Sequence, residues 1–184
     1  CGALRSPRSV DRAKEALRAA GYNGEKVVLM VPSNSAVLMA LGSVMDDMLK
    51  RIGMNTEVYA GEFNAKLQRR NRRGPVSDGG WSLFVTNWSG ADWLNPAGHI
   101  ALRGNGDQGY AGWANMPRIE ELRSAWFRAP DTAAQQAICR DMQTEAFAQS
   151  AYYPLGQYLQ PTAHRASLMG IVDGFATFWN VRRA

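Results

Sequence analysis

The sequence predicts an α/β fold in which helices flank a mixed, mostly parallel β-sheet. Over the first half of the chain, segments with helical periodicity alternate with short β-rich runs in the order α-β-α-β-α-β. Ser9 and Ser35 each precede a helical stripe, and Gly21 and Gly53 follow those stripes, which gives both helices an N-cap and a C-terminal glycine. Alternation of this kind favours parallel strands, because each helix returns the chain to the start of the next strand.

Six elements are expected before residue 88. Pro32 ends the first strand, and Gly79-Gly80 marks the turn before the third. The third strand is an apolar run, and we expect it to be buried. In chain order the predicted elements are a helix over 10–20, a strand over 26–31, a helix over 35–52, a strand over 56–59, a helix over 62–72 and a strand over 81–87.

The second half of the chain predicts helices and long irregular segments. Residues 94–116 are rich in Gly, Asn and Pro and indicate a long loop with one helical turn. Pro117 suits the first position of a helix that ends at Arg128, and Asp131 caps another over 132–149. An extended segment over 152–160 follows. The tail over 170–184 carries Val172, Phe175, Phe178 and Trp179, so we expect it to pack against something.

Length and composition are those of one globular domain or one lobe of a larger protein. The chain has 184 residues, of which 46% are hydrophobic and 20% charged. No apolar run approaches the roughly 20 residues of a membrane-spanning helix. The net charge is +5, and the one dense basic cluster is Arg69–Arg73 at the end of a predicted helix. This cluster predicts a solvated helix end, with a phosphate-binding patch as the alternative.

The two cysteines, Cys1 and Cys139, are too few for a disulfide framework or a Cys-x-x-Cys metal site. Whether they pair is left open by the sequence. Cys1-Gly2 matches either the lipidated start of a bacterial lipoprotein or a cut in a longer chain, and we expect the cut. No cofactor or metal site is expected, because no pattern of ligand residues has the required spacing.

The best candidate site is the loop that follows the third strand. Ligands of open α/β sheets bind beyond the carboxyl ends of the strands. There the chain places Asn87, Trp88, Asp92 and Trp93, and Tyr59 lies at the end of another predicted strand. We expect the indoles to line a pocket, Asn87 to offer hydrogen bonds and Asp92 to bind a ligand ammonium. The alternatives are that the indoles fill core gaps and that Asp92 caps a helix beginning at Trp93.

Two other classes of function remain open at this stage. An enzyme with a composite site would be expected to use His99 or His164, although no G-x-S-x-G turn is present to position a nucleophile. A nucleic-acid-binding module would use Arg69–Arg73, and its affinity would fall steeply with salt. The absence of a recognisable catalytic pattern makes a non-enzymatic binding role the leading hypothesis.

Six segments, in order along the chain, resemble the C-terminal part of the periplasmic dipeptide and oligopeptide solute-binding proteins of ABC importers, extracellular solute-binding family 5. The "AKxLLAEAGY" and "LxKIGI" motifs of that family correspond to two helix ends, its "GWxADY" motif to the candidate loop, and "YIPLxQ" and "GF…FWNV" to the final segments. The matching residues are 13–22, 27–29, 48–54, 87–92, 153–157 and 174–181.

The resemblance implies the C-terminal lobe of a type II periplasmic-binding-protein fold, with residues 1–159 forming the lobe. Residues 160–184 would be a tail that returns to the missing N-terminal lobe. The resemblance also implies a periplasmic location, an ABC permease in the inner membrane as partner, and a peptide or other small solute as cargo. In the family the loop aspartate commonly pairs with the peptide α-amino group, a role that falls on Asp92. Here Asp92 lies four residues after Trp88 instead of the usual three, and other members bind nickel complexes, sugars or opines.

Overall fold

The computed structural model describes residues 7–174 and 177–184, except for the side chains of Phe63 and Lys66. Two expectations, the chain cut at Cys1 and the packing of Phe175, fall outside the described residues. The chain divides into two compact units, residues 1–88 (unit 1) and residues 89–184 (unit 2). Each unit is described by itself. The boundary after residue 159 remains a prediction.

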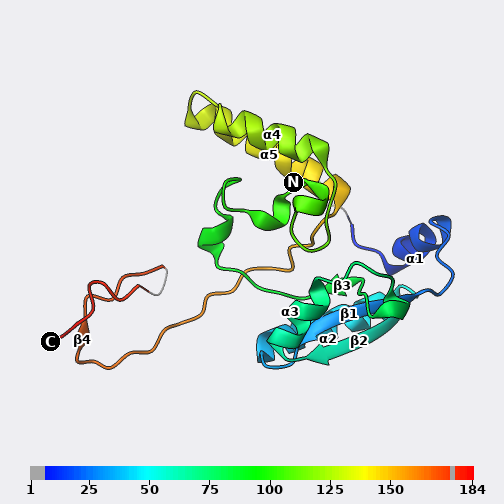
Figure 1. The fold of residues 1–184 in the computed structure, drawn as a ribbon, viewed down its shortest axis with the longest axis horizontal. Helices are drawn as coiled ribbons and strands as arrows, with labels where there is room; N and C mark the ends of the chain where they lie inside the picture. Colours follow the sequence, from blue (N-terminus) through cyan, green and yellow to red (C-terminus); the bar gives the residue numbers. More distant parts are fainter. Residues whose placement is uncertain (1–6, 175–176) are drawn as a thin grey trace. The chain divides into compact units, whose positions relative to one another are not determined.

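Unit 1 is built on a three-stranded parallel sheet in the order β2-β1-β3 (Figure 1). Five of its elements alternate between strand and helix, as the sequence predicts, which confirms the α/β class. A first helix, α1, precedes them. The elements are α1 (Val10–Ala19), β1 (Lys26–Pro32), α2 (Ala36–Arg51), β2 (Asn55–Gly61), α3 (Phe63–Arg70) and β3 (Leu83–Phe84).

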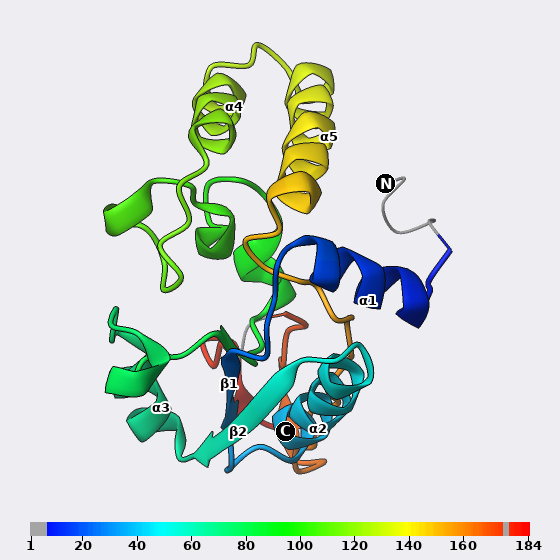
Figure 2. The same cartoon turned by 90° about the vertical axis from the view of Figure 1, so that its right-hand side faces the viewer.

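Helices α2 and α3 lie on opposite sides of this sheet. The chain crosses from β1 outward to β2 through α2, and then back over β1 to β3 through α3, so right-handed crossovers put the two helices on opposite faces. Figure 2 shows them on either side of β1 and β2. The core on the α2 side contains Leu29 and Val31 from β1, Val85 just after β3 and Leu38 from α2, all under 5% exposed.

Local sequence signals set the helix ends. The Ser9 and Ser35 side chains accept hydrogen bonds from the Arg12 and Leu38 N–H groups, and both helices are followed by a glycine with positive φ. The prediction of both capped helices is therefore confirmed.

The third strand is present, but the expectation of a buried strand over 81–87 was wrong in its length and burial. β3 contains two residues, Leu83 and Phe84, which pair with Leu29 and Met30 and are half-buried, whereas Val85 just beyond them is buried. The pairing stops because Pro32, the next residue of β1 to face this edge, has no N–H to donate. The chain therefore leaves the sheet before Asn87, and the aromatic loop begins earlier than the apolar run suggested.

Unit 2 is built on a hairpin of two helices, α4 (Pro117–Phe127) and α5 (Thr132–Gln149), which lie side by side (Figure 1). Pro117 occupies the first turn of α4, and the Asp131 carboxylate accepts a 2.8 Å hydrogen bond from Ala134 N–H, as expected. Its core joins both helices, with Met116, Ile119, Leu122 and Met142 all under 9% exposed.

Irregular segments surround the helical hairpin of unit 2. The predicted long loop over 94–116 contains the 3₁₀ turns η4 (Ile100–Leu102) and η5 (Gly106–Gln108), and a further 3₁₀ turn, η3 (Gly90–Trp93), precedes it. Residues 152–160 form no regular element. Near the C-terminus, β4 (Leu168–Met169) pairs antiparallel with β5 (Arg182–Arg183). Within the described part of the chain, no helix is both long enough and apolar enough to span a bilayer.

Candidate ligand-binding site

The predicted site residues are distributed over both units. Tyr59, Asn87 and Trp88 belong to unit 1, whereas Asp92 and Trp93 belong to unit 2. Asn87 and Trp88 follow β3 in the last residues of unit 1, where both are exposed, and the Trp88 side chain is 37% exposed. The expectation that they follow the carboxyl end of a parallel strand is met, and neither is buried in the core.

Tyr59 lies inside β2, not at its end as the sequence suggested, because the strand continues to Gly61. The Arg69 guanidinium of α3 lies 4.3 Å from the centroid of the Tyr59 ring. This guanidinium also donates a 2.9 Å hydrogen bond to the Gly80 carbonyl. A cation over the ring face is attracted by the π-system, so one face of Tyr59 is already covered within unit 1.

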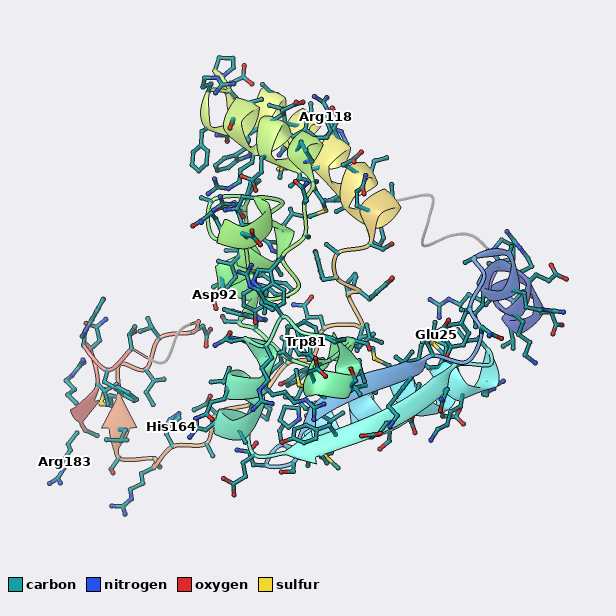
Figure 3. All side chains as sticks on the ribbon, turned by 45° about the vertical axis from the view of Figure 1, so that its right-hand side comes forward. Glu25, Trp81, Asp92, Arg118, His164 and Arg183 are labelled. Atoms are coloured by element: carbon teal, nitrogen blue, oxygen red, sulfur yellow. The ribbon has the colours of Figure 1, made fainter. Side chains whose placement is uncertain are left out.

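The arginine cluster is partly structural. Arg69 and Arg70 are half-buried, the Arg70 guanidinium carbon lies 5.9 Å from the Phe84 ring centroid, and the Arg70 carbonyl accepts a hydrogen bond from Trp81 Nε1. Trp81 in turn contacts Phe84 edge-on at 5.1 Å (Figure 3 labels Trp81). The prediction of a solvated helix end holds for Arg72 and Arg73, which are exposed, but not for Arg69 and Arg70, because their long side chains pack on aromatic rings.

Asp92 lies in η3, and its side chain is half-exposed (Figure 3). The alternative that Asp92 caps a helix beginning at Trp93 is wrong. No helix begins there, and the N-cap of η3 is Ser89, whose hydroxyl accepts a 3.3 Å hydrogen bond from Ala91 N–H. Among the described residues the Asp92 carboxylate makes no hydrogen bond or ion pair. A half-buried carboxylate without a partner is suited to bind a ligand cation.

Trp93 ends η3 and forms an aromatic cluster with His99 and Tyr152. The Trp93 and His99 rings are stacked with centroids 4.4 Å apart, and Tyr152 contacts the Trp93 ring at 5.5 Å. The Tyr152 hydroxyl and His99 Nε2 are 3.1 Å apart, within hydrogen-bonding distance. Trp93 therefore packs on neighbouring rings while part of its surface remains accessible.

Burial affects both polar members of this cluster. His99 is 9% exposed, and desolvation lowers the pKa of its imidazole below the usual value. Burial likewise raises the pKa of the Tyr152 phenol. Both groups are therefore neutral at pH 7, and no charge accompanies the three rings.

Side chains of α4 hold the loop that carries His99. Arg123 donates hydrogen bonds to the Pro96 and Ala97 carbonyls, at 3.0 and 3.4 Å. Glu120 Oε1 accepts from the Arg103 guanidinium at 2.9 Å and from Gly104 N–H at 2.8 Å. Burial raises the pKa of Glu120, but these hydrogen bonds outweigh it and the net shift is downward. The loop wall is thus preorganised by charge-assisted hydrogen bonds.

The sequence interpretation missed the cluster, since it considered His99 only for a composite catalytic site and gave Tyr152 no role. His99 and Tyr152 are 53 positions apart, and no local pattern joins them. The described residues contain no group of three or more His, Cys, Asp or Glu that could hold a metal ion. His164, the other histidine, is exposed in the C-terminal segment (Figure 3).

Comparison with known proteins places the chain in a family. The model of the bacterial extracellular solute-binding proteins, family 5, matches residues 4–110. The chain belongs to this family. A probable peptide ABC transporter periplasmic-binding protein of Sinorhizobium fredii is 31% identical over 175 residues, which are 95% of this chain and 33% of the relative. The chain thus spans about a third of that family member's length.

Solved structures of other proteins share the fold of this chain. The substrate-binding protein CtaP of Listeria monocytogenes has a TM-score of 0.61 at 16% identity, covering 78% of this chain and 28% of that protein. NikA of Brucella suis, in complex with Fe(III)-EDTA, has a TM-score of 0.58 at 16% identity, covering 77% and 30%. MelB of Agrobacterium fabrum, in complex with stachyose, has a TM-score of 0.57 at 13% identity, covering 79% and 25%. The predicted type II periplasmic-binding-protein fold is confirmed.

Proposed function

We propose that this chain is the C-terminal lobe of a family 5 solute-binding protein that captures a peptide or other small solute for an ABC importer. The whole protein would hold the solute between two lobes in the periplasm and deliver it to an inner-membrane permease without transforming it. Binding would favour closure, because the solute contacts both lobes only in the closed state. Residues 160–184 would return to the N-terminal lobe, which fits the strong exposure of Phe178 and Trp179 here.

The observation that carries the proposal is the Asp92 carboxylate, half-exposed and without a partner among the described residues. Asp92 would bind the solute ammonium, and Trp88 and Trp93 would supply ring surface. Asn87 would donate or accept hydrogen bonds. Tyr59 is the weakest of the five candidates, because Arg69 already covers one face of its ring.

Calorimetry of the full-length protein against a panel of amino acids and short peptides tests the proposal. Removing one partner of a desolvated charge pair costs about 2–5 kcal/mol, so Asp92→Asn should weaken binding by roughly 30-fold or more. Asp47→Asn is the matched control, since this carboxylate is 71% exposed on α2. Unchanged affinity in Asp92→Asn, with a solute that the wild-type protein binds, would remove Asp92 from the site.

A further inference from the structure

Unit 2 contains a hollow of about 300 Å³ that the proposed role of Asp92 does not use. Trp93, His99 and Tyr152 form one part of its wall, and Met142, Ala146 and Phe147 from α5 form another. All the lining residues lie between positions 93 and 154, so the hollow belongs to unit 2 alone.

Specific hydrogen bonds fix the wall of this hollow. Arg123 and Glu120 fix the loop over 95–104, and the Asn95 side chain accepts a 2.9 Å hydrogen bond from Ala97 N–H within it. Ser150, with φ of 54°, ends α5 and donates its N–H to the Ala146 carbonyl, which turns the chain back toward Tyr152. The three rings are thus held by the loop over 95–104 and by the turn at the end of α5.

The chemistry of the lining selects for a neutral, largely apolar occupant. None of the described lining residues is Asp, Glu, Lys or Arg. The polar side-chain groups of the lining include the Tyr152 hydroxyl, the Asn95 and Gln143 amides and the Cys139 thiol. His99, although nine-tenths buried, leaves Nδ1 without a hydrogen-bond partner among the described residues. A charged group would lose its hydration there without gaining a counter-ion.

Volume sets the size of the occupant. A dry cavity of about 150 Å³ holds benzene, so a hollow twice as large accommodates a bicyclic ring. Aromatic walls favour aromatic occupants through offset stacking and edge-to-face contacts. We propose that this hollow binds one compact aromatic ring with a single neutral hydrogen-bonding group, such as an indole or a phenol.

We assign the ring to a side chain of the solute, and this step rests on the proposed function. Asp92 and Trp93 are adjacent in η3, with the carboxylate available to an ammonium and the indole in the wall of the hollow. A solute with both groups, such as a peptide or amine with an aromatic side chain, would use both features.

The hollow is tested on the 184-residue chain with free indole as the probe. Cys139 lines the hollow and is half-buried, so a bound ring should shield its thiol from alkylation. Saturating indole should slow alkylation of the Cys139 peptide at least threefold, measured by mass spectrometry. Failure of indole to slow alkylation would overturn the proposal.

Paired substitutions on α5 provide the control. Ala146→Phe places a ring in the hollow and should abolish the protection by indole, whereas Ala148→Phe lies on the same helix at an exposed position and should retain it. Gln143→Trp, at an exposed lining position, should block the hollow even if Ala146→Phe fails to fold. Equal protection of Cys139 by indole in all folded variants would overturn the proposal that indole binds in the hollow.

The full-length protein tests the source of the ring. A solute with an indole side chain should bind about tenfold more tightly than its alanine counterpart, and Gln143→Trp should remove this preference. Equal binding of the two solutes, together with protection by free indole, would overturn the assignment of the ring to the solute. Unchanged affinity in Asp92→Asn, with protection by free indole intact, would instead remove Asp92 from the site and leave the binding of a ring in the hollow standing.

Discussion

The rings around the sheet of unit 1 and the rings of the Trp93 cluster in unit 2 have different neighbours. In unit 1 the Tyr59 ring lies beneath the Arg69 guanidinium, and Phe84 lies beside Arg70 and Trp81. In unit 2, Trp93, His99 and Tyr152 pack on one another around a hollow. Rings covered by cations stabilise the fold, whereas rings around a hollow retain surface for a ligand. Ligand chemistry should therefore be concentrated in unit 2, where Asp92 also lies.

The largest effects are expected from substitutions in the two hydrophobic cores, which test whether the two units are separate. Leu29 in unit 1 and Ile119 in unit 2 are both 0% exposed. Truncating either to alanine leaves a cavity and should cost about 2–5 kcal/mol of the free energy of unfolding. Hydrogen-exchange mass spectrometry should show the greater loss of amide protection in the unit that carries the substitution. Equal losses in both units for both variants would contradict the division into two compact units.

Removing the Tyr152 hydroxyl tests whether the unit 2 cluster is held by its hydrogen bond. Tyr152→Phe keeps the ring but leaves His99 Nε2 without its partner at 3.1 Å. A buried polar group without a partner costs about 1–3 kcal/mol, which urea unfolding would measure. Tyr153→Phe is the matched control, because the neighbouring ring is 61% exposed. Equal effects of the two substitutions would show that the hydroxyl does not hold the cluster.

A smaller effect is expected from uncovering Tyr59 in unit 1. Arg69→Gln removes the guanidinium above the ring and its hydrogen bond to the Gly80 carbonyl. The expected loss is about 1 kcal/mol in the free energy of unfolding, because each contact is only partly buried. Arg51→Gln, at a 66% exposed position of α2, should change stability little. A loss in Arg51→Gln as large as in Arg69→Gln would contradict a structural role for Arg69.

The smallest effect concerns pH. Burial lowers the pKa of His99 in the folded state, so the unfolded chain binds the proton more readily at mildly acidic pH. Stability should therefore fall as pH decreases below the ordinary histidine pKa of about 6.5. His99→Gln should flatten this part of the stability profile, measured as urea midpoints between pH 7.5 and 5, whereas His164→Gln at an exposed position should not. If the urea midpoint of His99→Gln changes with pH as it does in the wild-type protein, another group causes the pH dependence of stability.

Sequence was most informative where structure is set locally. The caps at Ser9, Ser35 and Asp131 and the order of strands and helices in unit 1 follow from short-range patterns, and the structure confirms them. The length of β3 was missed because it depends on Pro32, which lies in a different strand.

The aromatic cluster shows what local patterns cannot provide. His99 and Tyr152 meet only because α4 fixes one loop and the end of α5 returns the chain, so no spacing rule connects them. Asp92 and Trp93 were identified because both follow the third strand closely, but the partners of Trp93 were not. The division after Trp88 also has no composition signal, since the residues on either side form one continuous polar loop.

A thermodynamic cycle on the full-length protein tests the role of Asp92 most directly. Calorimetry would compare a bound peptide with its N-acetylated form, in the wild-type protein and in Asp92→Asn. If Asp92 binds the ammonium, each change alone weakens binding, and the pair shows a coupling energy of at least about 1.5 kcal/mol. Strictly additive effects of acetylation and substitution would contradict contact between this carboxylate and the solute amine.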